Sequence, residues 1–122
     1  RGRHCRFNMW EPKAWGVFQA MTEQEAFSKY EMHQLKRAGT YKALNKLIQG
    51  SAADQTKQAI IECYEVGHRP LLQIHDELCF NISGDKDIEI IKNKMEHCLD
   101  DVPMKVPSKV DIALGDNWGE TT

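Results

Sequence analysis

The most informative stretch of this 122-residue chain is PLLQIHDELCFNIS, residues 70–83. Two apolar runs, LLQI and LCFNI, flank the tripeptide His75-Asp76-Glu77. Alternating runs with β-branched residues, separated by a short polar break, are typical of two strands joined by a tight turn. The sequence therefore predicts an antiparallel β-hairpin over residues 70–83, with the three polar residues at its tip.

Two helices are predicted ahead of the hairpin. Thr22 and Glu25 form a capping-box pattern, which indicates a helix from about residue 23 to Arg37. A second helix should start after Thr40 and continue to about Val66. Gly50 lies inside it and should bend it or split it in two, because glycine weakens a helix interior.

The remaining segments complete the predicted organisation. Residues 1–9 alternate loosely between basic and apolar and indicate a short strand. Trp10 and Trp15 flank a loop and are predicted to be packing anchors. A one-faced helix follows the hairpin, and SKVDIALG should close the chain as a strand before DNWGE. The fold class is α+β, a hairpin or sheet packed by helices, organised as residues 1–9, 22–67, 70–83 and 86–118.

Composition and the N-terminal sequence argue against a membrane-spanning or secreted protein. A mean hydropathy of -0.58 and the lack of an 18-residue apolar run argue against a transmembrane helix. No secretory signal pattern is present at the N-terminus. No CxxC or Cys/His pair has zinc-ligand spacing, so the four cysteines are interpreted as scattered reduced thiols. The chain opens on Arg1 without an initiator Met, which leads us to expect a processed chain or one cut from something longer.

The charge is distributed unevenly. Residues 1–49 carry nine Lys/Arg and four Glu, a net of +5, whereas residues 50–122 carry seven Lys/Arg and fourteen Asp/Glu, a net of -7. The basic half could meet phosphate while the acidic half presents carboxylates.

Tyr41, Asn45 and Gln49 are spaced i, i+4, i+8 and share one face of the predicted second helix. Leu44, Leu47 and Ile48 lie beside this face, where burial is possible. Carboxamides can donate hydrogen bonds to the minor-groove acceptors, which are nearly the same for every base pair. The spacing alone also fits a solvated polar face, and both interpretations stay open at this point.

Asp76 and Glu77 offer hard oxygen ligands of the kind that Mg²⁺ prefers. Adjacent residues of a strand point to opposite faces, so the two carboxylates are not expected to chelate one ion together. A two-metal site would need further ligands from elsewhere. Considered alone, the tripeptide is better read as a charged hairpin turn.

Taken together, the two motifs resemble the C-terminal palm of family A DNA polymerases, the bacterial polymerase I and phage replicative group. The first family pattern is N-x-x-I-Q-G-[TS]-A-A-D, and residues 45–54 read NKLIQGSAAD. The second is Q-[VI]-H-D-E, and residues 73–77 read QIHDE. The GRHCRF start and the VDIALGDNWGE end also resemble segments of this family.

The resemblance implies a role for each matching residue. Asp76 would bind the catalytic Mg²⁺ pair, with Glu77 as its acidic neighbour and His75 at the primer terminus. Asn45 and Gln49 would contact the minor groove of primer–template DNA near the new base pair. The family often has Arg four residues before the Asn, whereas this chain has Tyr41 there, with Lys42 adjacent.

The resemblance also implies partners. The first metal aspartate and the fingers residues that grip the deoxynucleoside triphosphate do not occur in this chain. We therefore expect an N-terminal polymerase segment as partner, in a split phage polymerase or a longer chain, and expect the isolated chain to be inactive. The alternative is a non-catalytic DNA-binding or interaction module derived from a polymerase palm. No membrane partner is expected, and the cytoplasm, of the host if the gene is a phage gene, is the expected location.

Overall fold

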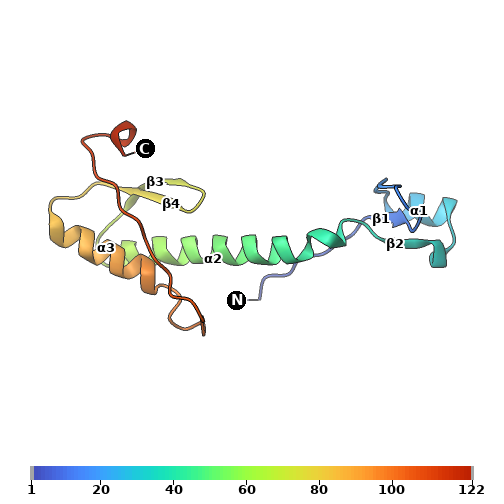
Figure 1. Ribbon diagram of the computed structural model, residues 1–122, viewed down its shortest axis with the longest axis horizontal. Coiled ribbons are helices and arrows are strands. Elements are labelled where there is room, and N and C mark those ends of the chain that lie inside the picture. The colour runs from blue at the N-terminus through green and yellow to red at the C-terminus, as the bar shows by residue number, and fades with distance from the viewer. Residues whose placement is uncertain (1, 122) are drawn as a thin grey trace. The chain divides into compact units, whose positions relative to one another are not determined.

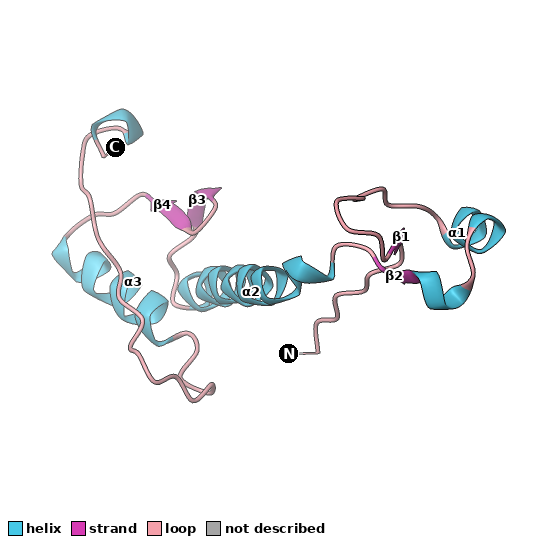
Figure 2. Cartoon of the chain, turned by 45° about the vertical axis from the view of Figure 1, so that its right-hand side comes forward, coloured by secondary structure: helices cyan, strands magenta, loops and turns pink. Residues whose placement is uncertain are grey.

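The structure, a computed structural model, describes residues 2–121. Within them, helices alternate with two separate antiparallel two-stranded sheets (Figures 1 and 2), which confirms the α+β class. The chain divides into an N-terminal unit, Arg1–Gly50, and a C-terminal unit, Ser51–Thr122. Among the described residues, no helix combines the length and the apolar character needed to cross a membrane.

The N-terminal unit is built on strand β1 (Trp10–Pro12), which pairs with strand β2 (Leu35–Arg37) in antiparallel register. Trp10 packs with Met21, Ala26 and Leu35 in a small buried cluster. The guanidinium carbon of Arg37 lies 3.8 Å from the centre of the Trp10 ring, and this contact covers the indole further. The prediction that Trp10 is a packing anchor is confirmed.

Helix α1 (Glu23–Lys29) is shorter than predicted. Its capping box is confirmed, because the Thr22 side chain accepts from the Glu25 N–H and the Glu25 carboxylate accepts from the Thr22 N–H. The predicted extension to Arg37 is wrong. A turn of 3-10 helix, Met32–Gln34, follows α1, and the chain then enters β2. Pairing with β1 outweighs the local helical pattern here.

The strand predicted over residues 1–9 does not form in residues 2–9, and the ladder begins at Trp10. At the end of this segment, the Met9 carbonyl accepts from the Ala38 N–H at 2.9 Å, next to the β1–β2 ladder. Side chains also hold the segment. Phe7 lies 5.2 Å from the Lys46 ammonium, and a Cβ built on Gly50 would stand 3.2 Å from the Cδ of Arg3. Gly50 thus permits a close approach that a larger residue would crowd.

Helix α2 (Ala43–Glu65) follows a 3-10 turn, Thr40–Lys42, and contains Gly50 without a break. The predicted extent is therefore confirmed, whereas a split at Gly50 is wrong. The end of the helix is marked by Gly67, whose φ of 90° suits a left-handed cap, and whose N–H donates to the Tyr64 carbonyl at 3.0 Å.

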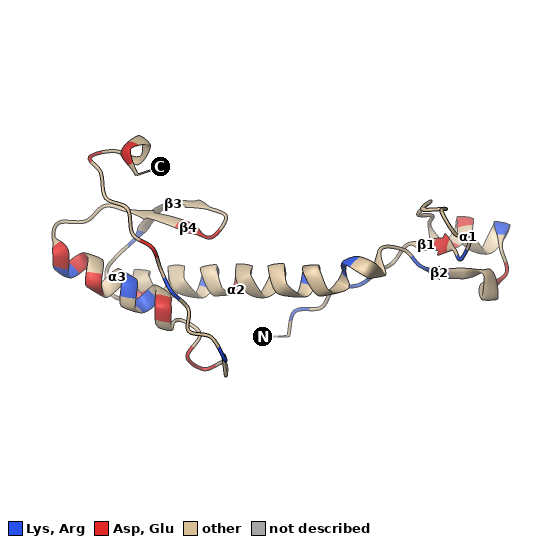
Figure 3. Cartoon of the chain, viewed as in Figure 1, with Lys and Arg blue, Asp and Glu red and all other residues tan. Residues whose placement is uncertain are grey.

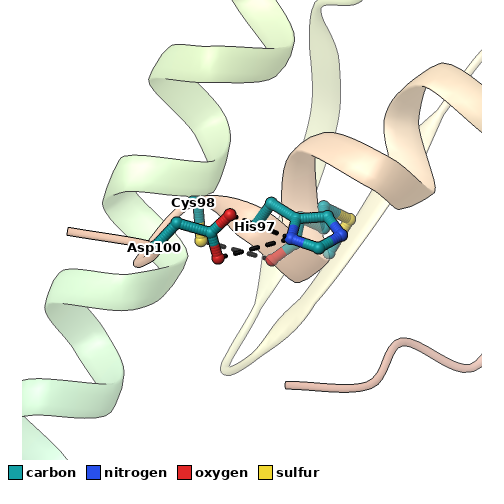
Figure 4. A network of polar contacts seen from close by, with 4 residues as sticks. His97, Cys98 and Asp100 are labelled. Carbon is teal, nitrogen blue, oxygen red and sulfur yellow. Dashed lines mark hydrogen bonds and ion pairs between the residues drawn. The ribbon is translucent and has the colours of Figure 1, made fainter. Parts of the chain in front are cut away.

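In the C-terminal unit, α2 presents Thr56, Ala59 and Cys63 to the interior at helical spacing. Helix α3 (Asp85–His97) is the one-faced helix predicted after the hairpin, and it supplies the buried Ile91. Just beyond α3, the buried Cys98 thiol donates to the Met95 carbonyl at 3.2 Å. Figure 4 shows Cys98 beside the contact between His97 Nδ1 and Asp100 Oδ2, which is 3.0 Å long.

The strand predicted for SKVDIALG is absent from residues 108–115. This segment is held by side chains rather than by a ladder. The Val110 N–H donates to Glu96 Oε1 at 3.1 Å, and Gln55 Nε2 donates to Ser108 Oγ at 2.8 Å. A strand needs a bonded neighbour, and no described segment supplies one.

Candidate metal and nucleic-acid site

The predicted hairpin is present. Strand β3 (Pro70–Ile74) pairs with strand β4 (Glu77–Phe80), and Ile74 lies opposite Glu77. The turn therefore contains only His75 and Asp76, while Glu77 is already the first residue of β4. His75 has a φ of 53°, in the left-handed region, and Gln73 Nε2 donates to its carbonyl at 3.1 Å.

All three tip residues are exposed to solvent. The Glu77 carboxylate accepts a weak hydrogen bond from the Cys79 thiol, 3.9 Å away and on the same face of β4. Among residues 2–121, no cluster of three or more His, Cys, Asp or Glu has metal-binding geometry. The hairpin tip therefore supplies hard carboxylate oxygens suited to Mg²⁺, but only part of the six ligands this ion takes.

The polar face of α2 is uncovered. Tyr41, Asn45 and Gln49 are exposed, and Lys42 Nζ lies 5.5 Å from the centre of the Tyr41 ring. The apolar residues beside this face, which the spacing allowed to be buried, are also largely exposed, namely Leu44, Leu47 and Ile48. The amides are thus free to meet a ligand from the outside, and apolar surface surrounds them.

The electrostatics of this part of the N-terminal unit favour an anionic partner. Residues 2–9 and 39–50 contain four Lys/Arg and no Asp or Glu. Figure 3 shows this basic character in the N-terminal segment and at the start of α2. The residues predicted for minor-groove contact, Asn45 and Gln49, belong to this N-terminal unit. His75, Asp76 and Glu77 belong to the C-terminal unit.

One group of exposed residues was missed by the sequence interpretation. Trp15 was predicted to be a packing anchor, but its side chain is 102% exposed, and Phe18 nearby is 79% exposed. Both rings lie in the loop after β1. A signal was available, because Gly16 between the two aromatic residues favours a projecting turn over a packed element.

Comparison with known proteins identifies the class to which this geometry belongs. The family model described as DNA polymerase family A matches residues 13–120, and the chain belongs to that family. A DNA-directed DNA polymerase of Pseudomonas phage M6 is 43% identical over 82 residues, which cover 67% of this chain and 12% of that protein.

Bacterial relatives match less of their own length. DNA polymerase I of Bacillus subtilis is 42% identical over 86 residues, covering 62% of this chain and 9% of that protein. The thermostable DNA polymerase I of Thermus aquaticus is 31% identical over 88 residues, covering 69% of this chain and 11% of that protein. The chain thus spans about a tenth of the length of these relatives. No solved structure is matched.

Proposed function

We propose that this chain is the part of a family A DNA polymerase that presents one Mg²⁺-binding aspartate and the minor-groove contacts to primer–template DNA. The observation that carries the proposal is the position of Asp76, exposed in a two-residue turn between paired strands. A carboxylate placed in this way can reach a metal without first ordering a long loop.

Asp76 is the proposed metal ligand, and Glu77 is its acidic neighbour on β4. When bound, Mg²⁺ would neutralise the charge that develops on the transferred phosphoryl group. The turn residue His75 would lie against the primer terminus. A second aspartate would come from an N-terminal polymerase segment, which would also supply the groups that grip the deoxynucleoside triphosphate.

Asn45 and Gln49 are the proposed minor-groove donors. They lie one helical turn apart on the exposed face of α2, so successive base pairs are within reach of the same face. Tyr41 and Lys42, in the 3-10 turn just before this helix, would contact the DNA at the position where the family often has Arg. The basic surroundings of the helix support these contacts.

Exposed apolar surface supports the assembly with an upstream segment. In the C-terminal unit, α2 and β3 border a groove of about 530 Å³. Its lining includes Tyr64 and Leu71, both 66% exposed. Contiguous apolar surface of this kind is characteristic of an interface. The relative from Pseudomonas phage M6 also suggests the cytoplasm of a host cell as the place of action.

The test is a chimera in which this chain replaces the matching segment of the Pseudomonas phage M6 polymerase. We expect Mg²⁺-dependent extension of a primed template, and no extension by the same chimera with Asp76→Ala. A folded chimera that binds primer–template DNA without extending the primer would instead indicate a non-catalytic DNA-binding module.

A further inference from the structure

Backbone hydrogen bonds hold together the two ends of the loop formed by residues 13–20, KAWGVFQA. Trp10 and Met21 form an isolated antiparallel bridge with two backbone hydrogen bonds, 2.9 and 2.8 Å long. A third bond, from the Lys13 N–H to the Gln34 carbonyl, is 2.8 Å long. Both residues of the bridge are buried in the core of the N-terminal unit. The ends of the loop are therefore fixed by packing and by hydrogen bonds.

The tip of the loop differs sharply from its base. Gly16 has a φ of 79°, and the Val17 N–H donates to the Ala14 carbonyl at 3.4 Å, so residues 14–17 form a turn that contains Trp15. Phe18 follows this turn directly, and both aromatic rings face solvent, 102% and 79% exposed. Large rings held in water at the end of an anchored loop are typical of a binding surface.

Charge favours a nucleic acid as the partner of this tip. Residues 12–22 contain Lys13 and no carboxylate. The carboxylate that precedes them, Glu11, is buried and paired with Lys36, with 3.3 Å between Oε1 and Nζ. A phosphate backbone can therefore approach residues 12–22 without meeting a carboxylate of that segment, whereas the exposed Glu23 and Glu25 begin α1 directly after it.

The size of the surface also favours bases over a protein. Two aromatic side chains offer about 150–250 Å² each, whereas a stable protein interface needs about 800 Å² from each partner. Unpaired bases are flat rings of matching size, and stacking on aromatic side chains is a common mode of single-strand binding.

We propose that Trp15 and Phe18 form a stacking platform for unpaired bases of the template strand. This inference rests on the proposed polymerase function, and it adds a single-strand contact distinct from the minor-groove and metal residues. Lys13 would accompany the backbone of the same strand.

The test measures binding of the 122-residue chain to two fluorescein-labelled oligonucleotides by anisotropy. One is an octamer of thymidines, and the other is an abasic strand with the same number of phosphates. We expect tighter binding of the thymidine strand. Trp15→Ala and Phe18→Ala should each weaken it by roughly fivefold to a hundredfold, without changing the affinity for the abasic strand. Trp15→Phe should retain most of the affinity.

Trp118→Ala is the matched control, because this side chain is half-exposed and lies in the C-terminal unit. It should bind both strands as the parent chain does. Unchanged thymidine binding in the Trp15→Ala, Phe18→Ala double variant would overturn the inference. The inference would also be overturned if the parent chain self-associated in sedimentation equilibrium, the double variant did not, and the two bound DNA equally. Failure of the chimera to extend a primer, with thymidine binding intact, would count against the proposed catalytic function alone.

Discussion

Ile74 and Glu77 face each other as the last antiparallel pair of the β3–β4 ladder, which leaves only His75 and Asp76 in the turn. Both ends of the turn are therefore held by paired strands. A short, held turn limits the conformations that the Asp76 carboxylate can sample, and this would lower the entropy lost on binding the proposed metal.

Asp76→Asn removes the charge of the proposed metal ligand and keeps its shape. In the chimera, we expect extension to fall by roughly a thousandfold or more, because charge stabilisation at the phosphoryl group is lost. Primer–template affinity should stay within a factor of about two. Single-turnover extension and a filter-binding assay measure the two quantities. Asp111→Asn, at an exposed aspartate of the terminal segment, is the control and should extend normally. Equal activity of both variants would contradict the metal role.

Gln49→Ala tests the exposed face of α2. A hydrogen bond to the minor groove contributes on the order of 1 kcal/mol, so its loss should reduce the preference for matched over mismatched primer ends by about fivefold. Turnover on the matched end should remain measurable. Single-turnover extension from both ends provides the comparison, with Asn93→Ala of α3 as a surface-amide control. Unchanged discrimination would leave this face a solvated surface without a role in sensing base pairs.

His75 occupies the left-handed region with a φ of 53°, which β-branched residues adopt at a cost. His75→Val should therefore destabilise the C-terminal unit by about 1–2 kcal/mol, whereas His75→Gly should be neutral or slightly stabilising. Urea unfolding followed by circular dichroism measures the difference. Equal midpoints for the two variants would show that the turn does not impose this conformation in solution.

Burial raises the pKa of the Cys63 thiol from 9.0 to about 11, with repulsion from Cys98 and Glu62 adding to the effect. The folded state therefore favours the neutral thiol. This contribution is fully present below pH 9 and is lost as the pH rises towards 11, by up to about 3 kcal/mol. The measurement is the free energy of unfolding between pH 8 and 11.

Cys63→Ala should remove this part of the pH dependence. Any loss of packing in this variant should lower the free energy of unfolding by the same amount at every pH. Cys79→Ala, at a half-buried thiol of β4, should keep it. The same pKa implies slow alkylation of Cys63 by iodoacetamide at pH 8, compared with the exposed Cys5. If both thiols were alkylated equally fast in the folded chain, the burial of Cys63 would be contradicted.

Local patterns allowed much of this protein to be predicted. The hairpin and its turn, the capping box at Thr22 and the helix from Ala43 to Glu65 each depend on residues close in sequence. Alternation, capping side chains and helical spacing act over a few residues, so they are visible without a fold. The exposed position of Asp76 follows from the same hairpin.

Other features depended on contacts between distant segments. Leu35–Arg37 carries a helical pattern but forms a strand, because β1, more than twenty residues earlier, offers its backbone as a partner. Residues 2–9 and 108–115 have strand-like patterns but form no strand among the described residues. The exposure of Trp15 was also decided in three dimensions. Trp10 fills the small core, while the Trp10–Met21 bridge directs the loop outward. Hydrophobicity alone determines that an indole prefers burial, and only the tertiary structure determines which of two indoles finds room.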